Sequence, residues 1–168
     1  MKNKTSNIAI VILAAGASSR MGSPKQLLNW GDDSLIRHAI HTALELQYTE
    51  VIVVLGANYD LIVTKIKDLP ITILKNEYWN LGLGKSIACA ADYVLKSKPK
   101  TQGLLITLAD QPLIDSCFLN TIIQGFLPRE NQIIATVAAQ YENEVEYSLN
   151  GGSFQSSNIF EDVPDGEH

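Results

Sequence analysis

Residues 8–25 read IAIVILAAGASSRMGSPK, so an apolar, largely β-branched run passes directly into a loop of small residues, hydroxyls, one arginine and one lysine. The apolar part, residues 8–13, is continuous rather than alternating, which is typical of a strand buried on both faces of a parallel sheet. Gly16 closes the run before the polar side chains begin. The stretch therefore predicts a buried strand that leads straight into a candidate binding loop.

Strands and helices alternate along the rest of the chain. Apolar runs predict further strands, and apolar residues at helical spacing predict helices between them. We expect strands at 51–55, 71–74, 104–108 and 133–138, and helices at 35–46, 60–67, 85–96 and 115–124. This order favours an α/β fold with three α/β/α layers around a mainly parallel open sheet. Ligands bind such sheets at the carboxyl ends of the strands, so the loops after Leu13, Leu74 and Leu108 should converge on one site.

The bulk composition excludes several classes of protein. A chain of 168 residues with 46% hydrophobic and 18% charged residues fits one globular domain rather than a disordered or fibrous protein. The net charge of -5 argues against a nucleic-acid partner. No apolar run is long enough to span a bilayer, and the first one ends in a Gly/Ser loop instead of a cleavage site, so we expect a cytoplasmic protein without a membrane partner.

The loop after residue 13 has the composition of a phosphate-binding loop. Small side chains let the backbone approach a polyphosphate and aim N–H groups at its oxygens. Arg20 and Lys25 can neutralise the charge of the phosphates. The loop is neither a Walker A motif nor GxGxxG, because Gly22 is followed by Ser-Pro-Lys. On composition alone, a solvated Gly/Ser turn explains it equally well.

Two further stretches carry polar groups at the expected ligand edge. Asp110 follows the predicted strand at 104–108, where one carboxylate together with phosphate oxygens suits magnesium; the alternative is a turn aspartate before Pro112. Residues 76–86 read NEYWNLGLGKS and enter a predicted helix, whose first N–H groups attract anions. Trp79 reads equally well as a core anchor. His38 and His41 read as solvated helix histidines, and Cys89 and Cys117 as reduced packing residues without metal-ligand spacing.

The residues 13–25 resemble a family signature. The string LAAGASSRMGSPK matches every fixed position of the LAAGxSxRMGxxK signature of the MobA-like nucleotidyltransferases. Asp110 with Gln111 and Pro112 is similar to the family's Asp-x-Pro element, and residues 76–86 to its Asn-x-x-Trp-x-x-Gly-(Met/Leu)-x-x-Ser segment. The resemblance runs from residue 8 to about residue 141. It implies a Rossmann-like sheet of the nucleotide-diphospho-sugar transferase type.

The resemblance also implies roles for individual residues. Asp110 would bind magnesium and act in catalysis together with Arg20 and Lys25. The nucleotide would be bound by Leu13, Ala14, Ala15, Gly16, Ala17, Ser18, Ser19, Asn76, Gly82 and Ser86. The form Ala-Ala-Gly, rather than Ala-Gly-Gly, is similar to members that use CTP instead of GTP and favours a cytosine base at Ala15. Ala-Asp-Gln-Pro is common in the molybdenum cofactor cytidylyltransferase branch.

The implied activity is transfer of CMP from CTP to a phosphorylated acceptor, such as the molybdopterin cofactor, with release of pyrophosphate. Two alternatives stay open. The acceptor can be a sugar phosphate or another small molecule, because the loop is shared across such enzymes. The chain can also be a catalytically weak nucleotide-binding module. The residues do not specify the acceptor or the oligomeric state.

The C-terminal part departs from the family pattern. No Gly-x-Pro element follows residue 141, where the family continues with a further strand and helices. Residues 148–168 are polar and acidic, which is typical of a weakly ordered tail. We therefore expect one domain at 1–147, with an incomplete C-terminal part, that binds nucleotide but transfers it poorly.

Overall fold

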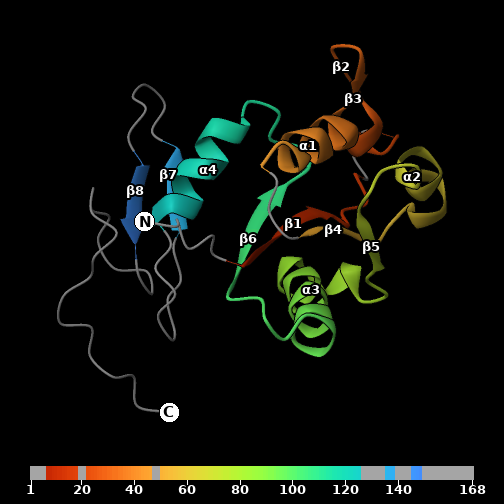
Figure 1. Ribbon diagram of the computed structural model, residues 1–168. Coiled ribbons are helices and arrows are strands. Elements are labelled where there is room, and N and C mark those ends of the chain that lie inside the picture. The colour runs from red at the N-terminus through yellow and green to blue at the C-terminus, as the bar shows by residue number, and fades with distance from the viewer. Residues whose placement is uncertain (1–6, 19–21, 47–49, 126–134, 139–144, 149–168) are drawn as a thin grey trace. The chain divides into compact units, whose positions relative to one another are not determined.

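The computed structural model describes residues 7–18, 22–46, 50–125, 135–138 and 145–148 (Figure 1). The chain divides into two compact units, residues 1–119 and 120–168. The elements, in chain order, are β1 (Ile8–Ala14), the 3₁₀ helix η1 (Lys25–Leu27), β2 (Asn29–Trp30), β3 (Asp33–Ser34), α1 (Leu35–Leu44), β4 (Glu50–Leu55), α2 (Tyr59–Ile66), β5 (Thr72–Lys75), the 3₁₀ helix η2 (Trp79–Leu81), α3 (Leu83–Ser97), β6 (Gly103–Leu108), α4 (Ser116–Gly125), β7 (Ala135–Ala138) and β8 (Val145–Ser148).

The first unit is built on a four-stranded parallel sheet in the order β5-β4-β1-β6. Strand β1 is central, and every one of its residues is buried. A strand with both faces covered needs apolar residues at every position, which is why its sequence does not alternate. The predicted fold class, a mainly parallel Rossmann-like sheet, is confirmed.

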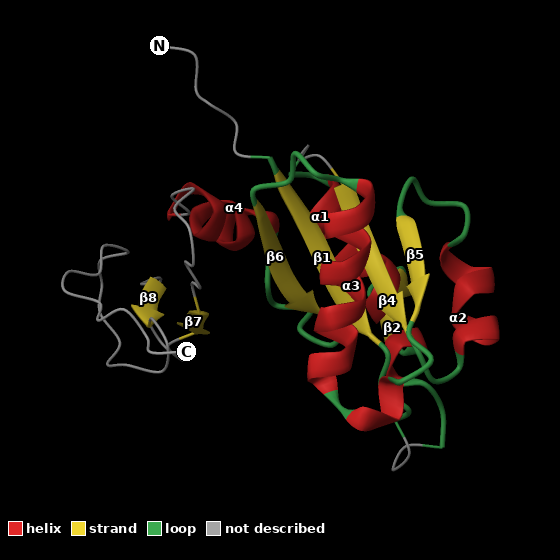
Figure 2. Ribbon diagram, turned by 90° about the horizontal axis from the view of Figure 1, so that it is seen from below, coloured by secondary structure: helices red, strands yellow, loops and turns green. Residues whose placement is uncertain are grey.

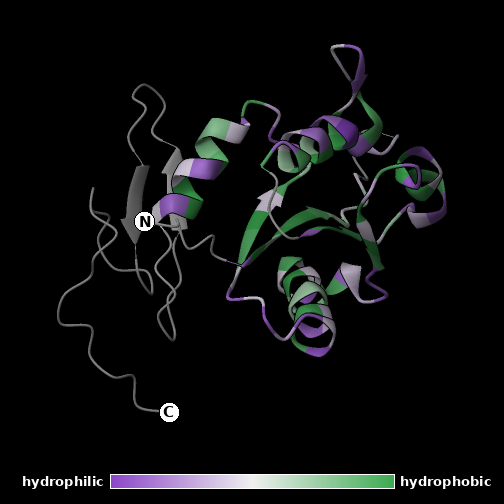
Figure 3. Ribbon diagram, in the orientation of Figure 1, coloured by the Kyte–Doolittle hydropathy of each residue, from purple (hydrophilic) through white to green (hydrophobic). Residues whose placement is uncertain are grey.

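Helices cover both faces of this sheet. Figures 1 and 2 show α1 and α2 on one face and α3 on the other. The α3 face has a core cluster that includes Ala9 and Val11 of β1, Val54 of β4, and Ala90 and Val94 of α3. Because successive side chains of a strand point to opposite faces, the alternate residues of β1 face α1. Figure 3 shows apolar residues along the strands and polar residues on the outer sides of the helices.

The register brings three strand ends to one edge of the sheet. Leu13 of β1 pairs with Val54 of β4 and with Leu108 of β6. The next bond in the ladder, from the Ala109 N–H to the Leu13 carbonyl, is 3.2 Å long. The loops that follow β1, β4 and β6 therefore start at neighbouring points.

Several element boundaries differ from the sequence-based expectation. Helix α3 starts at Leu83 instead of residue 85, because Gly82 turns the chain at a φ of 101° and the helix begins directly after it. The β2–β3 hairpin was not expected; its turn has Gly31 at a φ of 60°. The expected strand at 133–138 corresponds to β7, which pairs with β8 in antiparallel orientation. The tail at 149–168 lies outside the described residues, and the domain end at 147 stays a prediction.

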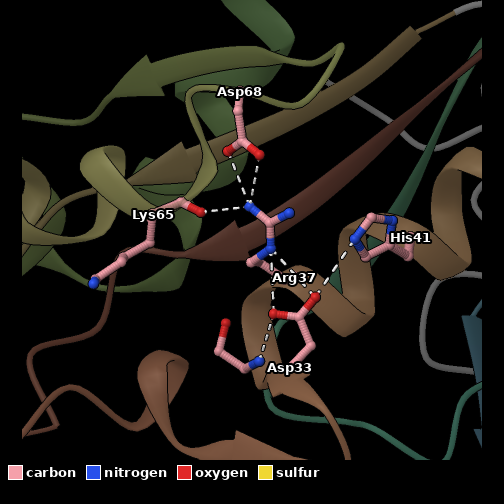
Figure 4. A network of polar contacts seen from close by, with 6 residues as sticks. Asp33, Arg37, His41, Lys65 and Asp68 are labelled. Carbon is pink, nitrogen blue, oxygen red and sulfur yellow. Dashed lines mark hydrogen bonds and ion pairs between the residues drawn. The ribbon is translucent and has the colours of Figure 1, made fainter.

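A polar network joins α1 to the end of α2 (Figure 4). Arg37 on α1 donates to Asp68 at 2.9 Å and 3.1 Å, to the carbonyl of Lys65 at 2.7 Å, and to Asp33 at 3.2 Å. The hydrogen bond to Asp68 is the main reason why the pKa of Arg37 is raised, and the same bond lowers the pKa of Asp68. His41 lies 3.6 Å from Asp33 and is half exposed. This network fastens the two helices that share one face of the sheet.

In the described part of the chain, no helix combines the length and apolarity that a membrane span needs.

Candidate functional site

A pocket of about 310 Å³ lies at the carboxyl edge of the sheet. This volume falls at the lower end of the range for small-molecule sites. It is lined by the ends of β1 and β6, by η1 and η2, and by the start of α3. The lining residues are Leu13, Ala14, Ala15, Gly16, Lys25, Gln26, Trp79, Gly82, Leu83, Ser86, Leu108, Ala109 and Asp110.

The pocket wall after β1 is main chain with little side-chain cover. Gly16 is exposed, and a Cβ atom placed on it would meet nothing within 4 Å. The Ala15 carbonyl accepts the Ala57 N–H at 3.0 Å, which joins the loop to the chain after β4. A ligand can therefore approach the backbone closely here, as the small residues of this stretch predict.

Gln26 supports this loop from within the protein. Its side chain is almost completely buried, with the residue 1% exposed. The carboxamide nitrogen donates to the Ala14 carbonyl at 3.0 Å and to the Gly16 carbonyl at 2.9 Å. No sequence pattern predicts this role of Gln26, because its partners are main-chain oxygens, which every residue carries.

Ser18 closes the loop with its side chain. It adopts a φ of 53°, which is uncommon for a residue other than glycine. Its hydroxyl accepts the Lys25 N–H at 3.0 Å and donates to the oxygen of Gln26 at 3.4 Å. The hydroxyl of Ser18 thus joins the first part of the loop to Lys25 and Gln26 where the loop ends, and Ser18 is not part of the pocket wall.

Lys25 and Asp110 meet in the pocket, although 85 positions separate them in the sequence. The lysine ammonium contacts one carboxylate oxygen of Asp110, and the two side chains are 40% and 32% exposed. Lys25 opens η1 and Asp110 follows β6, so the pair joins two of the converging loops. Asp110 therefore lies beside the loop that contains Gly16, as a single binding site formed by the two requires.

His38 fastens the chain that follows Asp110. Its Nε2 lies 3.0 Å from the carbonyl oxygen of Pro112, and its ring centroid lies 6.2 Å from that of Trp30. The expectation that His38 is a solvated helix histidine is therefore wrong. The reason is a contact between α1 and a loop distant in sequence, which helical spacing does not show.

Asn76 and Ser86 form a buried pair, of which only Ser86 lines the pocket. The Tyr78 N–H donates to the side-chain oxygen of Asn76 at 2.9 Å, so the amide nitrogen of Asn76 must face Ser86, 3.0 Å away. Ser86 accepts this bond, and its own O–H remains the donor that it can offer elsewhere. Ser86 lines the pocket and Asn76 does not. Asn76 orients Ser86 in this arrangement.

Gly56 lets Trp79 reach the pocket. A Cβ atom at position 56 would lie 2.6 Å from Trp79 Cγ and 2.9 Å from the Ala15 carbonyl oxygen, closer than real contacts allow. The tryptophan therefore packs directly on the backbone after β4 and forms part of the pocket wall.

Most of the residues predicted from the sequence come together. Those on the pocket wall are Leu13, Ala14, Ala15, Gly16, Lys25, Gly82, Ser86 and Asp110. Ala17, Ser18 and Asn76 are described but are not part of the wall. Ser19 and Arg20 lie outside the described residues. Gln26, Leu83, Leu108 and Ala109 line the pocket without having been predicted as site residues.

Asp110 is the acidic residue of the pocket wall, and among the described residues no three His, Cys, Asp or Glu side chains cluster as a metal site. A single carboxylate is a poor site for an ion on its own. Magnesium, however, commonly takes one or two carboxylates and completes its shell with phosphate oxygens and water. The residues present therefore fit an ion that arrives together with a polyphosphate.

Comparison with known proteins identifies a family model and several relatives. The family model of the MobA-like NTP transferase domain matches residues 10–152. Nicotine blue oxidoreductase of Paenarthrobacter nicotinovorans is 37% identical over 103 residues, which cover 61% of this chain and 48% of that protein. The chain thus spans about half the length of this curated relative.

Two solved structures share the fold. Rv0371c of Mycobacterium tuberculosis H37Rv, solved in complex with manganese, has a TM-score of 0.58 at 23% identity and covers 71% of this chain and 59% of its own. CMP:2-keto-3-deoxy-manno-octonic acid synthetase, solved in complex with CTP, has a TM-score of 0.63 at 17% identity, with 92% and 66% covered. At these identities the likeness concerns the fold alone.

Proposed function

The chain belongs to the family of MobA-like NTP transferase domains, and from this premise we propose that it is a magnesium-dependent nucleotidyltransferase that acts on CTP. In the proposed reaction, CMP passes to a small phosphorylated acceptor, with the molybdopterin cofactor as the favoured candidate, and pyrophosphate leaves. The observation that carries the proposal is the meeting of Lys25 and Asp110 at the mouth of the main-chain loop after β1. The proposed location is the cytoplasm.

The triphosphate is proposed to lie along residues 14–19. The exposed backbone around Gly16 supports this, because main-chain N–H groups bind phosphate oxygens without the bulk of a side chain. Lys25 and Arg20 supply positive charge. Ser86 offers its O–H from the pocket wall, since Asn76 already donates to its oxygen.

CTP is preferred over GTP in this proposal. The basis is the sequence Ala14-Ala15-Gly16, in which the second residue is alanine and not glycine. The CTP complex of the synthetase described above agrees with a cytidine nucleotide in this fold, although that protein shares only 17% identity with this chain.

Asp110 is the residue proposed to hold magnesium. An ion bound there with the triphosphate would supply positive charge against the departing pyrophosphate. The manganese complex of Rv0371c supports a divalent ion in this fold. Lys25 lies beside Asp110 and supplies a second positive charge at the same place.

The proposed reaction needs alignment and charge stabilisation from the protein, not a covalent nucleophile. An oxygen of the acceptor phosphate attacks the α-phosphorus of CTP, and the bond to the pyrophosphate oxygen breaks. The loop and the two basic residues hold the triphosphate in line. Gln26 and Ser18 keep the loop closed around it.

Pyrophosphate release tests the proposal. We would incubate the chain with magnesium and CTP or GTP, offer a molybdopterin-type acceptor or a set of sugar phosphates, and measure pyrophosphate and, by calorimetry, binding. Acceptor-dependent release that is faster with CTP than with GTP is the expected result. Release with sugar phosphates alone would mean that the acceptor is a sugar phosphate and not a molybdopterin. Binding without release would support a nucleotide-binding module.

Pyrophosphate also separates this proposal from redox chemistry. One relative is named an oxidoreductase, so membership of the family alone does not specify the reaction. A redox reaction of a small molecule releases no pyrophosphate. A chain that binds no triphosphate in the presence of magnesium would overturn the proposal.

A further inference from the structure

We propose that Gln26 is a positioning residue that sets the direction of the peptide groups in the loop after β1, and that triphosphate affinity depends on its two side-chain N–H donors. The inference rests on the proposed function, because it concerns how the same loop receives a polyphosphate. Gln26 is almost completely buried, and although it is one of the residues that line the pocket, its proposed role acts through the loop.

The orientation of the Gln26 carboxamide is determined by its partners. Its nitrogen lies 3.0 Å from the Ala14 carbonyl oxygen and 2.9 Å from that of Gly16. Both partners are acceptors only, so the group facing them must be the NH₂ and not the oxygen. Both of its hydrogens are thereby used on the loop. The remaining oxygen accepts the hydroxyl of Ser18.

These bonds fix the directions of the loop's N–H groups. The described residues contain no cis peptide bond, and in a trans peptide the N–H points opposite to the carbonyl of the same unit. With the Ala14 and Gly16 carbonyls held on Gln26, the N–H groups of Ala15 and Ala17 must point away from it. The intervening Ala15 carbonyl is held by the Ala57 N–H at 3.0 Å.

The consequence is electrostatic. Three successive carbonyl oxygens of the loop each accept a hydrogen bond from the protein. A carbonyl that turned toward the pocket would place a negative partial charge against the phosphates, whereas an N–H attracts them. Gln26 thus prevents the two peptide units that it holds from turning in the unfavourable direction.

Residues 14–17 of the loop have no polar side chains that could do this. Gly16 has open space where a Cβ would stand, and Ala14, Ala15 and Ala17 carry only methyl groups. Two N–H donors on one side chain satisfy both carbonyls, whereas a carboxylate would repel them. Gln26 and Lys25 are adjacent in η1, so the same turn that orders the loop also delivers the lysine to the pocket.

The test compares Gln26→Met, which keeps the length but has no donor, with Gln26→Glu, which keeps the shape but presents a carboxylate. Thr42→Val is the control, because Thr42 is also buried, at 8% exposure, and lies on α1. For each variant we would measure melting temperature and the Kd of magnesium-CTP and of cytidine, which has no phosphates. We expect Gln26→Met and Gln26→Glu to weaken CTP binding at least tenfold and cytidine binding less than twofold, while Thr42→Val changes neither.

A second measurement needs no variants. Scalar couplings across the hydrogen bonds from Gln26 Nε2 to the Ala14 and Gly16 carbonyl carbons show whether both carbonyls face Gln26, and therefore whether the Ala15 and Ala17 N–H bonds point away from it. We expect both bonds to point away from Gln26 and, on addition of magnesium-CTP, their resonances to shift more than those of the sheet. A folded Gln26→Met with unchanged CTP affinity, or the absence of either coupling in the wild type, would overturn the inference.

The two proposals fail in different ways. A wild-type chain that binds no triphosphate removes the proposed function, and the couplings then still decide whether Gln26 directs the two peptide units. A chain that binds CTP equally well with and without the Gln26 donors keeps the proposed function and removes the role of Gln26.

Discussion

Each end of the parallel sheet carries a carboxylate, and the two carboxylates have different surroundings. At the amino end, Glu50 of β4 accepts the hydroxyls of Thr72 at 2.6 Å and Tyr93 at 3.1 Å, and pairs with Lys98 at 3.1 Å. At the carboxyl end, Asp110 pairs with one lysine and faces a cavity. The side chain of Glu50 is 12% exposed and that of Asp110 is 32% exposed.

This difference separates a group that holds the fold from one that can receive a ligand. Burial on its own raises the pKa of Glu50, but the hydrogen bonds from Thr72, Lys98 and Tyr93 outweigh it, and the net pKa lies below the ordinary value. The Glu50 carboxylate is stabilised as an anion by groups of the protein itself. Asp110 has fewer partners and faces a cavity. Neutralising Asp110 should therefore lower ligand binding and leave stability unchanged, whereas neutralising Glu50 should lower stability and leave binding unchanged.

Asp110→Asn should have the largest effect. Removing the charge that we propose to hold magnesium should lower CTP-dependent pyrophosphate release by roughly 10²- to 10³-fold, the usual cost of a lost electrostatic stabiliser. The melting temperature should change little, because a partly exposed ion pair contributes little to stability. Asp92→Asn, an exposed acid on α3, is the matched control. Unchanged release would place the metal elsewhere.

Lys25→Ala comes next. Loss of a charge-assisted contact to phosphate should weaken triphosphate binding by about 1.5–3 kcal/mol in calorimetry. Cytidine, which has no phosphates, should bind as before. An equal loss for cytidine would show that the variant disturbs the pocket in general. It would then not support a phosphate contact of Lys25 at this end of the sheet.

Glu50→Gln should lower stability and leave binding unchanged, the reverse of the effects expected for Asp110→Asn. We expect the free energy of unfolding to fall by about 1–2 kcal/mol, since the variant weakens buried hydrogen bonds and an ion pair. Affinity for magnesium-CTP should stay within twofold of wild type. Urea unfolding and calorimetry measure the two quantities, and a loss of affinity without a loss of stability would contradict the assignment of roles.

The same variant makes a prediction about pH. The folded pKa of Glu50 is lowered, so its contribution is fully present above the unfolded value of about 4.3 and is lost as the pH falls through the folded value. Wild type and Glu50→Gln should therefore differ in unfolding free energy near neutral pH and converge in acid. Curves that stay parallel down to pH 3 would rule out this source of stability.

Arg37→Lys should have the smallest effect. Lysine cannot reproduce the several donors that Figure 4 shows between Asp33, Lys65 and Asp68. The network lies at the surface, so we expect a loss below about 1 kcal/mol that shrinks further in high salt. Melting curves at low and high salt measure it, with CTP affinity as the unchanged reference. A loss as large as that of Glu50→Gln would mean that this surface network matters as much as the buried cluster.

Strands were the easiest part of the fold to predict. Residues 8–13 are continuously apolar because β1 is covered on both faces, so burial itself left the signal. The meeting of the loops followed from the same logic, since parallel strands end at one edge. The β2–β3 hairpin could not be predicted in this way, because its strands have two residues each and no periodicity.

The site was predicted where function demands a residue type and missed where support comes from the main chain. Asp110 was predicted because a carboxylate follows the strand at 104–108, and Lys25 because it is a charged residue in a loop of small residues that resembles the family signature. Gln26 in SPKQLL reads as a surface residue of a helical turn, since nothing local shows that it will be buried against carbonyl oxygens. Asn76 was predicted to contact nucleotide, a role that stays a prediction; in the structure it orients Ser86.

The absence of a methyl group at position 56 controls the width of the cavity. With glycine there, the indole of Trp79 rests on bare backbone beside the Ala15 carbonyl. Even alanine would push on both neighbours, which would move the Trp79 wall of the cavity and the Ala15 peptide of the loop. Variation at this one position is therefore a way to retune which molecules fit the cavity while leaving its charges untouched.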